Sequence, residues 1–241
     1  LGCLLHSRGQ LREAEQLLRG AVIRLRPGVR MAATDAPPVE LLPRALLDLA
    51  GVLRDRGLPG EAAGLYREAI ALLKQPGRSG GPPLAVARAG YAQLLVGRGD
   101  LDEADAELGE ALPAVRQAHP GDHPEVAHGL FVLALLRMEQ GKLDEAGNLL
   151  AEARRIQEKA LGRIHPMVPR TRALEAELAR RRGQAAEAIA GARQAIEQLD
   201  RLGLAEHQSA VDARLTLGEA LMAAGEHEEA MRVLASGLPA A

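Results

Sequence analysis

Three histidines lie close together and are the residues best suited to bind a metal ion. His119, His123 and His128 fall within ten residues of one another. Neutral imidazole nitrogens are common zinc ligands, so this spacing raises a metal site as one interpretation. A metal site also needs a closed set of ligands, and the sequence does not show such a set.

A helix cap is the alternative interpretation of these histidines. His123 precedes Pro124, the pair recurs as His165 and Pro166, and His207 occupies the same phase. Proline is favoured in the first turn of a helix, and a polar side chain just before it can cap exposed backbone N–H groups. We therefore predict helix caps at these positions, with no bound metal and no cofactor.

Candidate catalytic groups are sparse. Cys3 and His6 lie three positions apart on one expected helix, which is a weak basis for a thiol nucleophile. Acidic pairs such as Asp102 with Glu103 recur at expected helix starts, where the helix dipole accounts for them. The chain has no Gly-rich phosphate loop, no CxxC pair and no nucleophile elbow. We predict that the protein is not an enzyme.

The elements that would position any functional residue follow an internal repeat. A Gly, a Glu four residues later and the Ala after that Glu recur six times, the first interval being 48 residues and the other four 42. A period of this length indicates an array of stacked units. The Gly and Ala positions are Gly9, Ala14, Gly57, Ala62, Gly99, Ala104, Gly141, Ala146, Gly183, Ala188, Gly225 and Ala230.

Each of these segments has the pattern of a joint between two helices. The Gly suits the left-handed conformation that ends a helix. The next residue, such as Asp100, can cap the following helix, and the Glu, such as Glu103, can bond the backbone N–H of that cap. The small Ala side chain, as at Ala146, lets the paired helices approach closely.

This pattern resembles the tetratricopeptide repeat (TPR). The fourth unit carries the family's residues, which are Leu133, Ala134, Gly141, Ala146, Leu150 and Ala153. The 42-residue spacing and the stretches 123–126 and 161–168 are similar to the longer repeat of kinesin light chains. The resemblance covers essentially the whole chain, and it implies an all-α fold, a right-handed α-solenoid of about six stacked helix-turn-helix repeats.

We expect a single TPR array over residues 1–241. Its repeats are expected at about 1–27, 43–75, 83–119, 124–161, 166–202 and 207–238, with a long inter-repeat loop at 26–43. Residue 1 enters the first hairpin partway through a helix, and no polar capping helix follows the last one. Solenoid ends normally need caps. We therefore expect a segment of a larger protein, or ends that something else covers.

Composition narrows the classes of partner. A net charge of −2 and three aromatic residues argue against nucleic-acid binding, and the lack of an 18-residue apolar run argues against a membrane span. The single Cys3 excludes an internal disulfide framework and favours a reducing compartment, the cytoplasm. Only three of the 30 basic residues are Lys, a bias that suggests a GC-rich bacterial genome.

Charge is segregated along the chain. Residues 99–152 hold twelve acidic and three basic residues, a net charge of −9, whereas residues 153–182 hold nine basic and three acidic residues, a net charge of +6. One interpretation is a solvated surface in which neighbouring charges compensate each other. The other is a basic cluster that recruits an acidic partner, because the planar guanidinium of Arg pairs with carboxylates through two hydrogen bonds.

The resemblance also implies where a partner would bind, since the first helix of each TPR hairpin lines a concave groove. The groove positions of this chain are Arg44, Arg54, His128, Phe131, Leu135, Met138, Arg170, Glu177, Arg180 and Arg181. Phe131 and Met138 are expected to form an apolar pocket beside the arginines. The ligand classes of chaperone-tail clamps and kinesin light chains are not implied, because the groove helices lack the Asn and Lys that those subtypes use.

Two functional hypotheses follow. The first is a non-catalytic scaffold whose groove holds a peptide or helix of a partner protein, acidic or amphipathic in character. The second is a regulatory or sensor TPR module of a larger signalling protein, such as a bacterial Ser/Thr kinase or a signalling ATPase. The pattern predicts neither nucleic acid nor membrane as a partner, and it makes no prediction of the oligomeric state.

Overall fold

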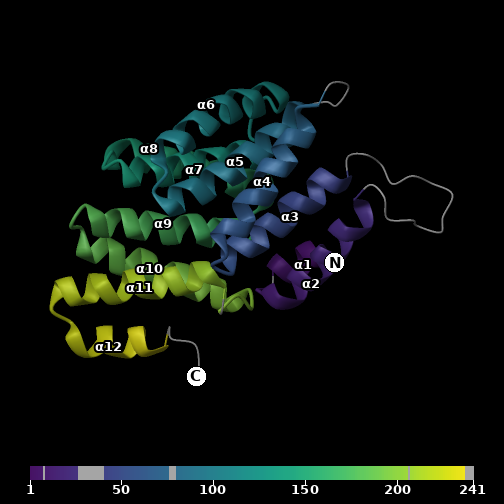
Figure 1. The fold of residues 1–241 in the computed structure, drawn as a ribbon. Helices are drawn as coiled ribbons and strands as arrows, with labels where there is room; N and C mark the ends of the chain where they lie inside the picture. The colour runs from purple at the N-terminus through teal and green to yellow at the C-terminus, as the bar shows by residue number, and fades with distance from the viewer. Residues whose placement is uncertain (8, 27–40, 76–79, 206, 237–241) are drawn as a thin grey trace. The chain divides into compact units, whose positions relative to one another are not determined.

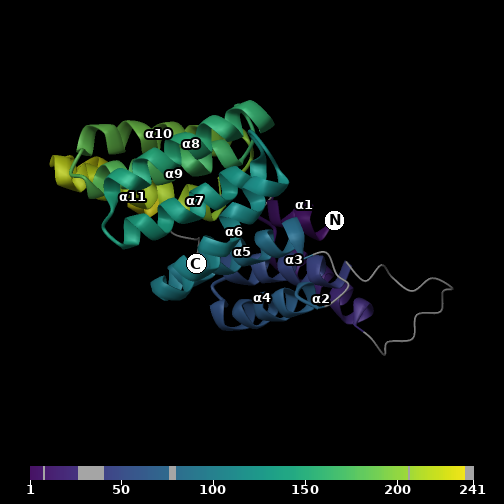
Figure 2. The same cartoon turned by 90° about the horizontal axis from the view of Figure 1, so that it is seen from above.

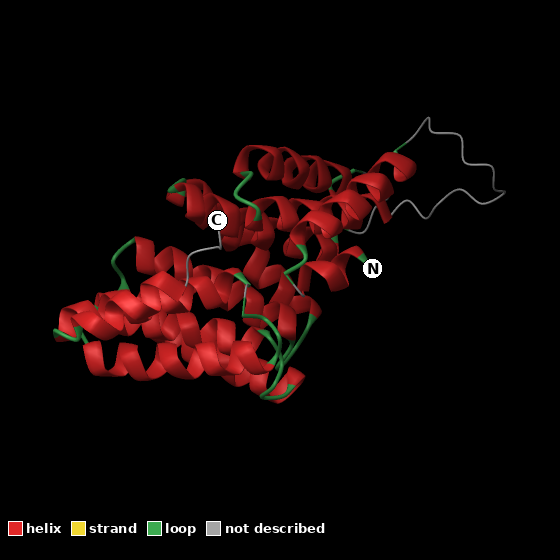
Figure 3. Cartoon of the chain, turned by 90° about the horizontal axis from the view of Figure 1, so that it is seen from below, coloured by secondary structure: helices red, strands yellow, loops and turns green. Residues whose placement is uncertain are grey.

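A computed structural model describes residues 1–7, 9–26, 41–75, 80–205 and 207–236. Every regular element in this described part is an α-helix, and the helices number twelve (Figure 3). They fall into two compact units, Leu1–Ala118 and His119–Ala241. None of the described helices is long and apolar enough to cross a membrane.

Unit 1 contains three helical hairpins (Figure 1). Its helices are α1 (Gly2–Ser7), α2 (Leu11–Leu25), α3 (Leu41–Asp55), α4 (Pro59–Leu73), α5 (Gly81–Arg98) and α6 (Leu101–Ala118). Each helix contacts the next one along the chain, and the first helices of successive hairpins, α1, α3 and α5, also contact each other in order. This order of contacts is the hairpin stacking that the repeat predicts.

Unit 2 repeats this arrangement. Its helices are α7 (Pro124–Glu139), α8 (Leu143–Leu161), α9 (Met167–Arg181), α10 (Ala185–Arg201), α11 (Gln208–Ala224) and α12 (His227–Ser236). Consecutive helices pack together, and α9 also contacts α11. Figure 2 shows the second helices α8 and α10 in one layer and the first helices α7, α9 and α11 in the other.

The six repeat glycines turn the chain between the helices of each hairpin, as predicted. All six have a positive φ, between 74° and 83°, which is the left-handed region that glycine reaches without steric cost. At Gly141, its own N–H donates to Met138 O at 3.0 Å and the N–H of Lys142 donates to Arg137 O at 2.8 Å. These two bonds satisfy carbonyl groups at the end of α7.

The expected side-chain capping is absent at three of these joints. Gln10, Lys142 and Gln184 stand at the N-caps of their helices, and none of the three side chains makes a cap hydrogen bond. At these three caps the backbone N–H already donates to a carbonyl at the end of the preceding helix. The repeat Glu therefore has no cap N–H left to bond.

The repeat alanines lie in the core. All six, from Ala14 to Ala230, have no exposed surface. Around Ala146, the core cluster contains Ala134, Met138, Leu150 and Leu178. The small side chain lets the two helices of the hairpin, and α9 beyond them, pack against one another, as the spacing predicts.

Each predicted repeat overlaps two of the described helices, and the exact repeat bounds stay a prediction. The predicted loop at 26–43 falls between the end of α2 at Leu25 and the start of α3 at Leu41, and most of it, 27–40, lies outside the described residues. The single continuous array over 1–241 stays a prediction, since it depends on how the two units join.

Candidate partner-binding surface

The histidines before α7 and α11 are N-caps, as predicted, and His165 makes the same bond from one residue before Pro166, the N-cap of α9. The Nδ1 atom of His123 accepts a hydrogen bond from the backbone N–H of Glu125 at 3.3 Å. His165 Nδ1 accepts from Met167 N at 3.3 Å, and His207 Nδ1 accepts from Ser209 N at 3.1 Å. The acceptor role requires an unprotonated Nδ1, so each of these rings carries its proton on Nε2 when neutral.

The cap also bears on the metal interpretation. His119, His123 and Glu125 place ligand atoms within 4.8 Å of one another. The two imidazole rings stack with centroids 3.7 Å apart, and His119 Nε2 lies 2.9 Å from Glu125 Oε2 without the alignment of a hydrogen bond. His123 could offer a metal only Nε2, which carries the proton while Nδ1 caps α7. A metal ion would therefore have to displace that proton and break the cap.

In unit 1, the predicted groove residues belong to an internal ion network. Arg44 is exposed and pairs with Asp48 on its own helix at 3.2 Å. Arg54 pairs with Asp55 at 2.8 Å and donates to Gln93 Oε1 at 2.8 Å, which links α3 to α5. His6 Nε2 lies 2.7 Å from Asp55 Oδ2 and links α1 to α3.

The carboxyl of Asp55 is the centre of this network. Burial alone would raise its pKa, but the hydrogen bond with His6 and the charge of Arg54 outweigh burial and hold the pKa well below its usual range. The ring of His6 therefore bonds the carboxylate of Asp55. The side chain of Cys3, the other residue of the Cys3–His6 pair, lies outside the described part of the structure.

In unit 2, the predicted arginine cluster is also paired. Glu177 accepts from Arg180 at 2.7 and 2.8 Å and from Arg181 at 2.8 Å. Arg180 further pairs with Glu219 at 3.0 Å, and Arg181 with Glu139 at 2.8 Å. Burial opposes ionisation of Glu177, yet the hydrogen bonds from the two arginines lower its pKa.

Ion pairs of this kind connect neighbouring hairpins within each unit. Arg181 and Glu139 are 42 residues apart, which is one repeat, and Arg19 donates to Glu61 across the same separation at 2.7 Å. In unit 2 the basic run also pairs with the preceding acidic run, since Arg155 contacts Asp122 at 2.8 Å. The acidic and basic runs of the sequence are therefore partly paired with each other, both within one hairpin and between adjacent hairpins.

Three of the predicted groove residues converge on one small cavity. His128, Phe131 and Arg170 line it together with Gln157, Met167 and Thr171, and its volume is about 10 Å³. Met138 does not line this cavity, because it is only 3% exposed and packs in the core of the α7–α8 hairpin. Leu135 is half-buried on the same helix.

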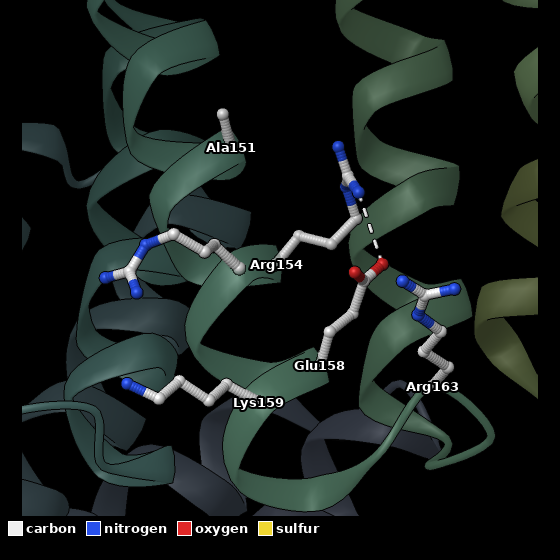
Figure 4. Close-up of a pocket in the computed structure, with 6 residues that line it drawn as sticks. Ala151, Arg154, Glu158, Lys159 and Arg163 are labelled. Carbon is white, nitrogen blue, oxygen red and sulfur yellow. Dashed lines mark hydrogen bonds and ion pairs between the residues drawn. The ribbon is translucent and has the colours of Figure 1, made fainter.

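A second, shallower cavity of about 390 Å³ lies along α8. Figure 4 shows Arg154 and Glu158 reaching toward each other, with Lys159 directed the other way. Lys159 bonds Asp122 at 2.6 Å, and Arg154 bonds Glu175 at 2.9 Å. The acidic neighbours thus compensate most of the positive charge at this surface.

Sequence reasoning missed Gln157 and Thr171. Both are fully buried polar residues on second and first helices respectively, and Thr171 Oγ1 lies 2.8 Å from Gln157 Oε1. A signal was present, because the residues 42 positions before and after Gln157 are Val115 and Leu199. A polar residue at a repeat position that is otherwise apolar indicates that this hairpin has a polar group in its core where the other hairpins do not.

A family model described as the MalT-like TPR region matches residues 1–236. The chain belongs to the MalT-like TPR family. No curated protein matches it. The family indicates no catalytic activity, and TPR folds commonly serve as protein-interaction modules.

Solved structures share the fold of this MalT-like TPR chain. A chain described as a kinesin light chain with nearly identical TPR-like repeats, from Podosopora anserina, has 25% identity and a TM-score of 0.59, covering 83% of this chain and 93% of that one. A Rap protein complexed with competence and sporulation factor has 14% identity and a TM-score of 0.72, and the match covers 98% of this chain and 72% of that one. A signal transduction ATPase with a TPR sensor, from Pyrococcus horikoshii, has 15% identity and a TM-score of 0.59, and the match covers 92% of this chain and 35% of that one.

Proposed function

We propose that this chain is a non-catalytic scaffold that binds a peptide or helix of a partner protein along the first helices of unit 2. The observation that carries the proposal is the convergence of His128, Phe131 and Arg170 on one cavity. These residues come from two successive first helices, α7 and α9, and the repeat assigns them to the face where TPR arrays bind partners. We call the half-buried and exposed residues of this face the groove surface, defined as His128, Phe131, Leu135, Arg170, Glu177, Arg180 and Arg181.

The chemistry of the groove surface favours a partner that combines apolar and acidic groups. Phe131 and Leu135 offer half-buried apolar side chains one turn apart on α7. Arg170 adds a guanidinium, whose Nε donates to Ser209 Oγ at 3.1 Å. Arg180 and Arg181 already pair with carboxylates of the chain itself, so they define the border of the surface and contribute less attraction to a partner.

The test is a peptide selection on the purified chain. A phage-displayed library of random peptides is panned against the wild-type protein, and enriched peptides are synthesised and measured by fluorescence anisotropy. We expect the affinity of these peptides to fall at least about tenfold in Phe131→Ala with Arg170→Ala. The loss of an aromatic anchor and the loss of a charged hydrogen bond each weaken binding by about 1 kcal/mol or more. Circular dichroism and thermal melting confirm that the variant is folded.

A matched control changes residues of the same types away from the groove surface. Leu17→Ala with Arg201→Ala alters an exposed apolar residue and an exposed arginine on the second helices α2 and α10. This control should bind the selected peptides as the wild type does. If the library yields no binder, or if binders are equally tight to the groove variant, the proposed function is wrong.

A second candidate function is a sensor or regulatory module of a larger signalling protein, such as a bacterial Ser/Thr kinase or a signalling ATPase. The shared fold with the TPR sensor of a signal transduction ATPase supports it, although this chain spans about a third of that protein. Reading the complete gene tests this candidate, since a kinase or nucleotide-binding motif beside the array is the expected result. The cytoplasm is the compartment we propose, because the chain has one cysteine and no disulfide framework.

A further inference from the structure

One core position of the repeat differs in the fourth hairpin. Near the end of the second helix, the residues one repeat apart are Leu73, Val115, Gln157 and Leu199, and all four are buried. Three of them are apolar, as expected for a core. Gln157 has no exposed surface, so its amide is shielded from bulk solvent.

The residue opposite Gln157 departs from the repeat in the same way. Thr171 on α9 occupies the position that is Ala87, Gly129 or Ala213 in other hairpins, and it too is fully buried. Its hydroxyl lies 2.8 Å from Gln157 Oε1 and 3.1 Å from the carbonyl oxygen of Met167. The two departures therefore form one polar pair between α8 and α9.

This pair leaves one hydrogen-bond donor unused. Gln157 Nε2 has no partner within the described residues, although it is buried. Buried amide groups are normally bonded, and an unbonded one destabilises the fold. Gln157 and Thr171 both line the small cavity, whose volume of about 10 Å³ admits about one water molecule or one ligand oxygen atom.

The rest of the cavity wall indicates the chemistry of its occupant. Phe131, the only Phe of the chain, supplies an apolar wall, and Arg170 supplies a positive charge from the neighbouring helix. An amide donor and a guanidinium together suit an anionic oxygen better than a neutral one, because hydrogen bonds to charged groups are stronger. A carboxylate on a short aliphatic stem matches this combination.

We propose that the cavity between α7, α8 and α9 is a subsite for one Asp or Glu side chain of the partner peptide. One carboxylate oxygen enters the cavity and accepts from Gln157 Nε2, whereas the other oxygen and the methylene groups stay outside the cavity, beside Arg170 and Phe131. The subsite rests on the proposed function, since it lies within the groove surface. It goes further by naming the side chain that is recognised and the buried amide that recognises it.

The experiment compares acidic and neutral versions of the selected peptides. Each Asp or Glu is replaced in turn by Asn or Gln, and dissociation constants are measured with wild-type protein and with the full-chain variants Gln157→Leu and Gln157→Glu. In the wild type, one replacement should weaken binding about tenfold or more, the effect of one hydrogen bond to a charged group. In Gln157→Leu this preference should disappear, and in Gln157→Glu it should reverse, because two carboxylates repel each other.

A matched control and a stability measurement separate recognition from folding. Gln184→Leu changes an exposed glutamine of the same unit and should leave the preference unchanged. Gln157→Leu restores the residue type of the other hairpins, so its melting temperature should equal or exceed that of the wild type. If Gln157 has only a structural role, Gln157→Leu should lower the melting temperature and leave the preference for acid unchanged.

The outcomes distinguish the two proposals. If peptides bind the groove surface but the acidic preference is absent, or is the same in Gln157→Leu, the subsite is wrong and the cavity holds a structural water, while the proposed function stands. If no peptide binds, or if the double variant Phe131→Ala with Arg170→Ala binds the peptides as tightly as the wild type, the proposed function is wrong. The subsite is then wrong as well.

Discussion

Near the end of the second helix, unit 1 carries Leu73 and Val115, whereas unit 2 carries Gln157 and Leu199. The apolar residues fill the core between one hairpin and the next. Gln157 occupies the same position but needs a partner, which Thr171 provides on the facing helix. The same repeat position is thus purely structural in unit 1 and partly polar in unit 2.

This difference shows how a repeat can acquire a specific site. The helix joints and the small residues are identical in kind in both units, so the backbone framework does not depend on Gln157. A polar residue in the core destabilises the fold unless its groups are bonded. Its presence beside Phe131 and Arg170 is therefore the feature that sets unit 2 apart as the candidate for binding.

The largest expected effect comes from placing the glutamine in unit 1. Leu73→Gln should lower the free energy of unfolding by about 2–4 kcal/mol, because it removes a buried aliphatic group and buries an unpaired amide. Ala87 stands where Thr171 stands in unit 2, so the equivalent of the Thr171 hydroxyl is missing. Urea denaturation followed by circular dichroism measures the loss.

Two further variants sharpen this prediction. Leu73→Gln with Ala87→Thr should recover part of the stability, since it recreates the polar pair of unit 2. Leu17→Gln, at an exposed position of α2, should leave stability nearly unchanged. A single Leu73→Gln variant as stable as the wild type would show that the core of unit 1 tolerates an amide without a partner.

Overpacking a hairpin should have a smaller effect. Ala146→Leu should destabilise unit 2 by about 1–3 kcal/mol, because the added atoms must fit into a core that leaves Ala146 no exposed surface. The matched control is Ala151→Leu, which is exposed on the same helix. Thermal melting of the two variants tests the contact, and equal melting temperatures would contradict it.

The ion networks of the two units offer a third comparison. Asp55→Asn should destabilise unit 1 by about 1–2 kcal/mol at neutral pH, because the carboxylate of Asp55 bonds His6 and Arg54. Glu177→Gln should weaken unit 2 for the same reason, since Glu177 bonds Arg180 and Arg181.

The pH dependence of these variants follows from the lowered pKa values of both carboxyls in the folded state. Their contribution to stability is complete above the unfolded-state pKa of about 4 and is lost as the pH falls below it. Urea melts at pH 7 and pH 3 should therefore show the gap between wild type and variant narrowing at pH 3. If the difference in stability between wild type and variant is larger at pH 3 than at pH 7, these carboxylates do not stabilise the fold through the bonds described.

The smallest effect concerns a surface cluster of three charged residues in unit 2. Hydrogen bonds from Arg155 and Lys159 lower the pKa of the Asp122 carboxyl to about 2. Removing both bases by Arg155→Gln with Lys159→Gln should return this pKa to about 3.9. A titration of the side-chain carboxyl by carbon-13 NMR measures the change, and Arg163→Gln, in the same cavity along α8, serves as the control.

The sequence alone was sufficient for the framework of the protein. Gly141 and its equivalents predict the helix joints because only a residue without Cβ adopts their left-handed conformation readily. Ala146 and its equivalents predict the close helix pairs because the distance between helices depends on side-chain size. Both causes are local or act between adjacent helices, so they recur at a fixed period and can be read from one chain.

The tertiary structure decided which side chains find partners. Arg180 and Arg181 read as a basic cluster in the sequence, but they pair with Glu177, Glu219 and Glu139 once the hairpins stack. Gln157 and Thr171 are 14 residues apart and meet only because α8 packs on α9. Such contacts depend on which side chains face each other across a helix interface. The repeat period specifies where the backbones of the helices lie, but it does not specify which polar groups meet.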